Sequence, residues 1–148
     1  MEWRSKSFSA LSALELYKIL QVRIDVFMLE QDCLYPECDD KDQQSTHLFG
    51  WQDDTCVAYA RLLPPEVSYP GCSSIGRVVV HPDYRSHKYG KELMERAIAI
   101  QKQQFPGMPI RISAQEYLHK FYTDLGFIVE SEVYLEDNIP HQEMALYF

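Results

Sequence analysis

A group of cationic side chains follows a valine-rich segment and could bind phosphate. Arg85, His87, Lys88 and Lys91 fall within seven residues, with Gly90 among them. The valines predict a buried strand and the residues from about 88 predict a helix, so the cations lie where that helix begins. A helix start collects unpaired N–H groups and partial positive charge, and a glycine lets the backbone approach a ligand closely. The stretch therefore predicts a diphosphate site.

The composition limits the classes of protein to which the chain can belong. Its 148 residues, 46% of them hydrophobic, predict a single domain over residues 1–148 with a sizeable core. A formal net charge of -8 argues against a nucleic-acid partner. The sequence has no run of about 18 apolar residues, and residues 1–5 lack the apolar stretch of a signal peptide. We therefore expect a cytoplasmic protein with no membrane partner.

The four cysteines are interpreted as reduced hydrophobic residues. Their spacing matches no zinc ribbon and no CxxC pair, and a cytoplasmic chain seldom holds disulfides. A metal site built from Cys33, Cys38 and His47 lacks the usual ligand spacing, so we expect no metal. No cysteine has a basic partner nearby in sequence, which argues against a covalent intermediate on sulfur.

Hydrophobic periodicity predicts a mixed α/β chain in the α+β class, with a mostly antiparallel central sheet flanked by helices. Strands are predicted over 2–8, 46–51, 55–63, 74–80, 108–114, 127–135 and 143–148. Helices are predicted over 12–30, 88–104 and 116–125, the last closed by Gly126. The run Val78-Val79-Val80 indicates a strand buried on both faces.

The first predicted helix begins with a capping box formed by Ser12 and Glu15. Helical spacing gives it one apolar face, made by Leu16, Leu20, Ile24, Phe27 and Met28. Arg23 and Glu30 are expected on other parts of its surface, either as a structural pair or at the edge of an acceptor pocket. The acidic residues of 37–42, with Glu136 and Asp137, either attract a cationic amine or form solvated loops.

Two motifs resemble those of the GNAT acyltransferase family. Arg85-Ser-His-Lys-Tyr-Gly90 is similar to the R/Q-x-x-G-x-G/A motif, and Phe121-Tyr-Thr-Asp-Leu-Gly-Phe127 is similar to the F-Y-x-x-x-G-F signature. The segment Arg23–Gln31 and Ile139-Pro-His141 resemble the ElaA-like branch of this family. Lys88 departs from the general motif because it stands where the first glycine is found.

The resemblance implies a GNAT fold, acetyl-CoA as cosubstrate and an N-acetyltransferase activity. The pyrophosphate and pantetheine of acetyl-CoA would contact the residues Val78, Val79, Val80, Arg85, Ser86, His87, Lys88, Tyr89, Gly90, Lys91, Gln115 and Phe121. In the family the strand after Val80 diverges and opens a slot for cofactor and substrate. The Val80 N–H is then expected to polarise the thioester carbonyl.

Acyl transfer to an amine also needs an acid and a base. Tyr122 is the expected acid, because a phenol with a pKa near 10 stays protonated at neutral pH and can donate to a departing thiolate. His47, His141 and Glu143 are the candidate bases, acting directly or through water. We expect the amine to attack directly in a ternary complex.

Other functions stay open at this level. The chain could be a non-catalytic acyl-CoA-binding module or an acyl-homoserine-lactone-type acyltransferase. A P-loop NTPase is excluded, because Gly90-Lys91 is followed by Glu92 and no glycine lies five positions earlier. The expected partner is a small-molecule or protein amine, and relatives of this fold often form homodimers through their late strands.

Overall fold

Antiparallel strands form two sheets that are joined at a single bridge, in a computed structural model that describes residues 1–148. The first sheet has the order β1-β2-β3-β4, from Glu2–Ser7, Thr46–Gln52, Thr55–Leu63 and Ser74–Val80. The second has the order β5-β8-β6 with β7 on β8, from Ile110–Gln115, Ile139–Leu146, Ile128–Val129 and Tyr134–Glu136. Three α-helices accompany them: α1 Ala13–Arg23, α2 Tyr89–Gln104 and α3 His119–Asp124.

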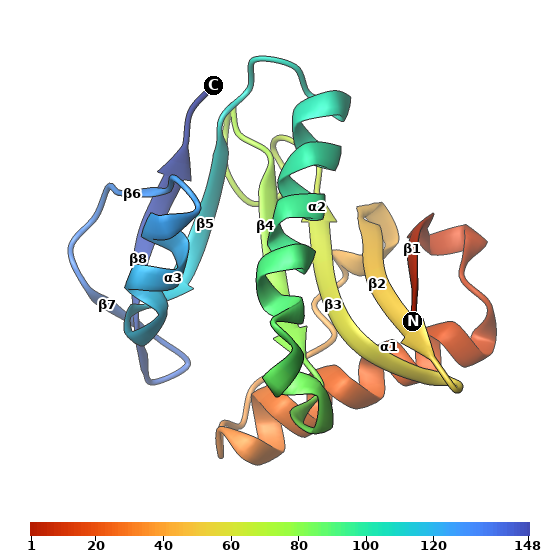
Figure 1. Cartoon of the computed structure of the whole chain (residues 1–148). Helices are drawn as coiled ribbons and strands as arrows, with labels where there is room; N and C mark the ends of the chain where they lie inside the picture. Colours follow the sequence, from red (N-terminus) through yellow and green to blue (C-terminus); the bar gives the residue numbers. More distant parts are fainter.

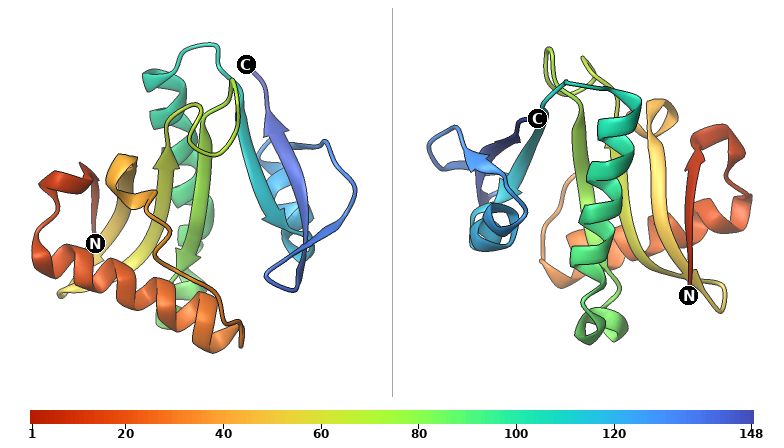
Figure 2. Two further views of the ribbon diagram at one scale, coloured as in Figure 1. Left: turned by 180° about the vertical axis from the view of Figure 1, so that it is seen from behind. Right: turned by 45° about the horizontal axis from the view of Figure 1, so that its top comes forward.

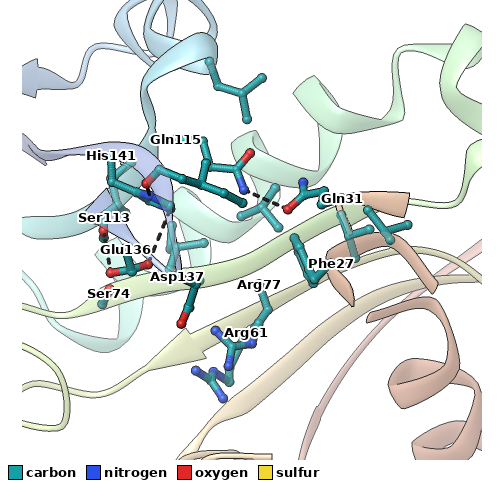
Figure 3. A pocket seen from close by; sticks show the side chains of 18 of the residues that line it. Phe27, Gln31, Arg61, Ser74, Arg77, Ser113, Gln115, Glu136, Asp137 and His141 are labelled. Atoms are coloured by element: carbon teal, nitrogen blue, oxygen red, sulfur yellow. Dashed lines mark hydrogen bonds and ion pairs between the residues drawn. The ribbon is translucent and has the colours of Figure 1, made fainter. Parts of the chain in front are cut away.

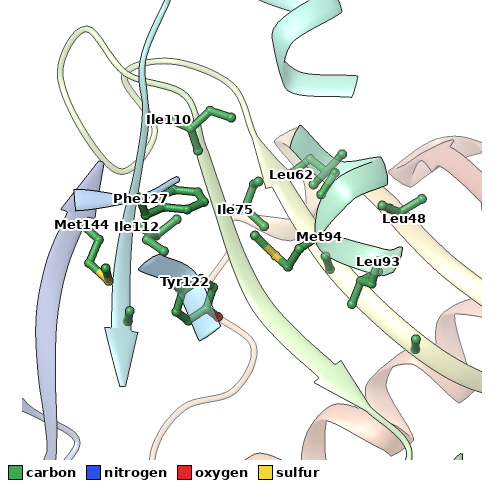
Figure 4. Close-up of a cluster of buried hydrophobic side chains, with 14 residues drawn as sticks. Leu48, Leu62, Ile75, Leu93, Met94, Ile110, Ile112, Tyr122, Phe127 and Met144 are labelled. Carbon is green, nitrogen blue, oxygen red and sulfur yellow. The ribbon is translucent and has the colours of Figure 1, made fainter. Parts of the chain in front are cut away.

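Helices α1 and α2 cover opposite faces of the first sheet (Figures 1 and 2). Side chains alternate between the faces of a strand, so β2 sends Leu48 toward α2 and Phe49 toward α1. The larger core joins Leu93, Met94 and Ala97 of α2 to both sheets (Figure 4). No helix of the chain is both long and apolar enough to span a bilayer.

Strands β4 and β5 lie side by side at one end and diverge along their length (Figure 1). Their junction is one parallel bridge between Ser73 and Ile110. There the Ser73 N–H donates to Pro109 O at 3.1 Å, and the Arg111 N–H donates to Ser73 O at 2.9 Å. Beyond this bridge β4 and β5 are not paired with each other, and the partner of β5 is β8. This divergence, which the family resemblance implied, opens a gap between the sheets.

The first helix begins as the sequence predicts but turns a different face to the core. The Ser12–Glu15 capping box is present, with both reciprocal bonds. Ile19, Val22 and Val26 are buried, whereas Ile24 is exposed, so the predicted apolar face is wrong. From Ile24 to Glu30 the chain is π-helical, and i→i+5 bonding changes which residues share a face.

The end of the chain also differs from the prediction. A tight hairpin joins β7 to β8. Its two-residue turn is Asp137-Asn138, with φ 50° and 64°. Strand β8 therefore starts at Ile139 rather than at residue 143. Gly126 closes α3 with φ 102°, as its position predicts. Strand β4 is not buried on both faces, because Val78 and Val80 stay partly exposed beside buried Val79.

Candidate active site

A cavity of about 750 Å³ occupies the gap between the two sheets (Figure 3). Its walls come from β4, β5, α3, the β7–β8 hairpin, the π-helical segment and the loop before β2. It brings together the predicted site residues Val78, Val79, Val80, Arg85, Gly90, Gln115, Phe121, Tyr122 and His141. Residues distant in sequence thus line one space of a volume typical for a small-molecule site.

A β-bulge in β4 shapes the wall on which Val80 lies. Tyr59 pairs with Val79 and Arg61 pairs with Gly76, so Arg77 and Val78 together oppose a single residue of β3. Arg77 takes a left-handed backbone conformation, φ 52°, which is strained for a residue other than glycine. The bulge bends the strand where the cavity begins, a common role for bulges beside functional sites.

The backbone of Val80 faces the cavity side of β4. The His81 N–H donates to Val57 O at 2.8 Å, so these two residues form a hydrogen-bonded pair. The neighbouring pair of the ladder is Val80 with Ala58. Hydrogen-bonded and non-bonded pairs alternate in an antiparallel ladder, so the polar groups of Val80 point away from β3. Arg85 Nε donates to Val80 O at 3.3 Å from that side. The Val80 N–H, on the same edge, is directed toward the gap.

The predicted diphosphate loop lies at the entrance to α2. Residues Pro82–His87 form a 3-10 turn, and Lys88 is the N-cap with φ 59°. A left-handed lysine therefore makes the turn for which the general motif has a glycine. Arg85 and Gly90 line the cavity, whereas Ser86, His87, Lys88, Tyr89 and Lys91 do not. These five residues stay near the mouth of the cavity, because they belong to the same short turn or to the first residues of α2.

Arg85 is held by an acidic partner on the π-helical segment. Its guanidinium pairs with Glu30, with Nη1 at 2.8 Å from Oε1 and Nη2 at 3.1 Å from Oε2. Both side chains are nearly half exposed, so they remain open to water and ligands. The structural pair of Arg23 and Glu30, one of the two possibilities that the sequence left open, is therefore not formed.

Tyr122 lines the cavity and belongs to the cluster of buried side chains shown in Figure 4. Its ring packs at right angles to those of Phe121 and Phe127. Burial raises the pKa of its phenol above the usual value near 10, because the charged form is poorly solvated there. The hydroxyl thus keeps its proton through the neutral range.

His141 joins a polar group on the wall made by the β7–β8 hairpin. Its Nδ1 lies 2.6 Å from Ile139 O, so the proton is assigned to Nδ1. Nε2 then carries the lone pair and lies 3.4 Å from Glu136 Oε2. The Ser113 hydroxyl donates to Glu136 Oε1 at 3.1 Å, which holds that carboxylate beside the imidazole (Figure 3).

Two of the three candidate bases lie outside the cavity. His47 is fully buried in β2, where its nitrogens bond Tyr59 Oη at 2.7 Å and Asp42 O at 2.9 Å. Burial lowers the pKa of His47, and neither nitrogen is free to take a proton from a ligand. Glu143 pairs instead with Arg111 at 3.6 Å. Of the three candidate bases, only His141 therefore lines the cavity.

Two acidic residues of the loop before β2 are neither solvated nor free to attract an amine. Glu37 and Asp42 are buried, where Arg23 binds both of them. Arg23, expected on the helix surface, is itself fully buried. The two acids draw it inward because a buried carboxylate requires a cationic partner. The acidic groups that line the cavity are Glu30, Asp39, Glu136 and Asp137, of which the last two lie on the β7–β8 hairpin.

Several cavity residues were missed by the sequence analysis. Gln31 accepts from Gln115 Nε2 at 3.1 Å across the gap, and Lys41, Arg61, Arg77 and Ser113 also line the walls. The charge of Arg77 inside a valine-rich strand was a signal that could have identified it. The side chains include no group of three that could hold a metal ion.

Comparison with known proteins agrees with this geometry. The family model described as "Acetyltransferase (GNAT) domain" matches residues 16–148. The chain is 40% identical to the Escherichia coli protein ElaA over 147 residues, which is 98% of this chain and 95% of that protein. The crystal structure of ElaA superposes with a TM-score of 0.92 at 38% identity and covers 99% of both chains.

Solved structures of acyltransferases share the same fold. An acyl-CoA N-acyltransferase from Pseudomonas aeruginosa has a TM-score of 0.92 at 40% identity, and 99% of each chain is covered. An aminoglycoside 6'-N-acetyltransferase complexed with coenzyme A has a TM-score of 0.72 at 12% identity over 97% of this chain and 96% of that one. That second likeness shows the fold alone. The chain therefore belongs to the GNAT acetyltransferase family and is similar to ElaA.

Proposed function

We propose that this protein is an N-acetyltransferase that uses acetyl-CoA to acetylate a primary amine by direct attack in a ternary complex. One observation carries the proposal: β4 turns the Val80 N–H toward a cavity that the diverging β5 leaves open. An unpaired strand edge can bind an amide-bearing ligand by strand addition. A backbone donor at that edge suits a carbonyl on which negative charge develops.

The residues around the cavity fit an acyl-CoA. The edge of β4 would take the pantetheine amides, and Gln115 lies opposite on β5. The start of α2, with Arg85 and Lys88, supplies N–H groups and positive charge for the diphosphate. A Cβ at Gly90 would meet only Val80 Cγ2 at 3.8 Å and Phe121 at 3.9 Å. The glycine thus leaves open a space that a ligand can use.

Tyr122 would protonate the departing thiolate. Acetyl-CoA supplies an activated acyl group, whose C–S bond breaks as the new C–N bond forms. The thiol of the leaving group has a pKa near 8.5, well below that of the buried phenol. Proton donation from Tyr122 is therefore uphill as an isolated equilibrium, so it would be driven by the overall conversion of a thioester to an amide.

His141 would accept the proton that the amine loses. The Nδ1 proton is fixed by Ile139 O, which leaves the Nε2 lone pair for the amine. Glu136 lies beside that nitrogen and would stabilise the imidazolium once it forms. In the Ser-His-Asp arrangement the orienting acceptor lies on the ring nitrogen opposite the reacting one, and here Ile139 O takes that place.

Release of free thiol from acetyl-CoA with a panel of primary amines tests the proposal. Turnover should appear with at least one amine, and Tyr122→Phe should lower kcat by about 100-fold or more. Tyr17→Phe is the matched control, because Tyr17 is 65% exposed on α1 and away from the cavity. Saturable coenzyme A binding without turnover of any amine would favour a non-catalytic acyl-CoA-binding module.

A further inference from the structure

The acceptor region of the cavity has walls of opposite charge. Arg61 and Arg77 lie together on one side in Figure 3, across from Glu136 and Asp137. Arg85 and Glu30 neutralise each other nearer the diphosphate loop. The charged side chains of these two walls, together with Lys41 and Asp39, therefore face the part of the substrate that is not coenzyme A.

Arg77 is held so that part of its guanidinium stays available. Its Nε lies 3.1 Å from Glu37 Oε1, and Nη2 donates to Glu37 O at 3.2 Å and to Asp39 at 3.4 Å. The ring of Tyr35 supports the group, with the guanidinium carbon 5.4 Å from its centroid. Nη1 has no hydrogen-bond partner in the protein, and the side chain is 21% exposed.

Lys41 adds a positive charge that no carboxylate balances. Arg23, Arg61 and Arg77 are matched by Glu37, Asp39 and Asp42 through direct ion pairs. Lys41 also lines the cavity, and its ammonium contacts only the Ser68 hydroxyl, at 3.2 Å. This wall thus has one net positive charge and several N–H donors without a protein acceptor. Arginine and lysine carry no acceptor of their own, so an anionic group is the complementary ligand.

We propose that the acceptor is an amino acid or a similar amine that also carries a carboxylate. Its carboxylate would bind Lys41 and Arg77, and its amine would lie on the side of Glu136 and His141. This inference rests on the proposed function and names its substrate class. A diamine would place its second ammonium against Lys41 and Arg77, and such repulsion is a usual source of specificity.

Matched acceptors test the carboxylate directly. Glycine, β-alanine, 4-aminobutyrate, 6-aminohexanoate and lysine would each be compared with their amides and with diamines of similar length, by thiol release. For at least one chain length we expect kcat/KM for the carboxylate to exceed that for the amide by about tenfold or more, the usual effect of one charge-assisted contact. Equal rates for the carboxylate, amide and diamine at every length would overturn the inference.

Variants of Lys41 identify the contact. Lys41→Gln should reduce the preference for carboxylate over amide to about threefold or less, and Lys41→Glu should reverse it in favour of the diamine. Lys18→Gln is the control, because Lys18 lies on α1 away from the cavity. An unchanged preference in Lys41→Glu, in protein that still binds coenzyme A, contradicts the assignment.

A binding measurement separates the two proposals if no amine is acetylated. With coenzyme A present, the N-acetyl amino acid should raise the Tm more than the N-acetyl amide of the same length. Equal shifts would overturn the carboxylate site. Turnover of amines without a carboxylate preference would overturn this inference alone and leave the acetyltransferase proposal standing.

Discussion

Replacing Arg23 by methionine tests the buried ionic group that supports the acceptor wall. Arg23 is fully buried and binds Glu37 and, at 2.9 Å, Asp42. Methionine keeps much of the apolar volume but removes the charge. Glu37 would keep Arg77, at 3.1 Å, and the hydroxyl of Tyr35, and Asp42 would keep Arg61, at 3.0 Å.

The expected loss of unfolding free energy is about 3 kcal/mol. Removing one partner of a buried ion pair usually destabilises a protein by about 3–5 kcal/mol, and the remaining arginines place this case at the lower end. For a chain of this length the Tm should fall by roughly 6–12 °C. Arg96→Met is the matched control. Arg96 forms an exposed i,i+4 pair with Glu92 at 3.0 Å, and we expect a loss of about 1 kcal/mol or less.

Urea unfolding at pH 7 and at pH 4 measures the loss of unfolding free energy and the direction in which it changes with pH. Burial opposes ionisation of Asp42, but Arg23 and Arg61 outweigh it and lower the pKa of this carboxyl. In the parent protein this stabilisation is present above the unfolded pKa, near 3.9, and is lost as the pH falls through the lowered folded pKa. Without Arg23 the folded pKa of Asp42 rises, so the variant protonates this carboxyl at a higher pH than the parent does, and the difference between the two proteins should shrink as the pH falls through that range. A loss below about 1 kcal/mol at pH 7, or a loss that grows as the pH falls, would refute the reasoning.

Three further substitutions separate folding from function. Gly90→Ala should leave the unfolding free energy unchanged or raise it by about 0.5 kcal/mol. It should weaken coenzyme A binding about tenfold in calorimetry, because the new Cβ enters the space of the ligand, and an unchanged affinity would place the ligand elsewhere. Gly126→Ala should lower the unfolding free energy by about 1–2 kcal/mol, since Gly126 has φ 102° and its Cβ would lie 3.1 Å from Leu146 Cδ1; a neutral result in urea unfolding would show that this turn relaxes freely. Cys33→Ser should keep kcat within about threefold of the parent value, because burial and the nearby Asp137 raise the pKa of this cavity thiol. An acetyl label that stays on the denatured parent protein, but not on the denatured variant, would instead indicate an acyl-cysteine.

Local signals predicted most of the secondary structure. Ser12 and Glu15 mark a helix start, and Gly126 marks a helix end, because each satisfies backbone groups within a few residues. The burial of Arg23 on the first helix has a tertiary cause. Arg23 is buried by carboxylates that lie 14 and 19 residues further along the chain, and no helical periodicity contains that information.

The cavity was predictable only in part for the same reason. The loop at residues 85–91 and the Phe121–Phe127 segment carry short motifs that identify their own positions. Arg77 faces the cavity because of the bulge in β4, and Lys41 faces it because of the path of the loop before β2. Both features depend on strand pairing. His47 was misleading because a histidine on a strand reads the same whether it faces a cavity or, as here, Tyr59.

Titration of the isotopically labelled protein with acetyl-CoA, followed by backbone amide NMR, tests the central claim most directly. We predict saturable binding in which the largest shifts fall on the amides of residues 78–80 and 85–91. A well-folded protein that shows no saturation, or whose shifts gather away from the gap between β4 and β5, would contradict it.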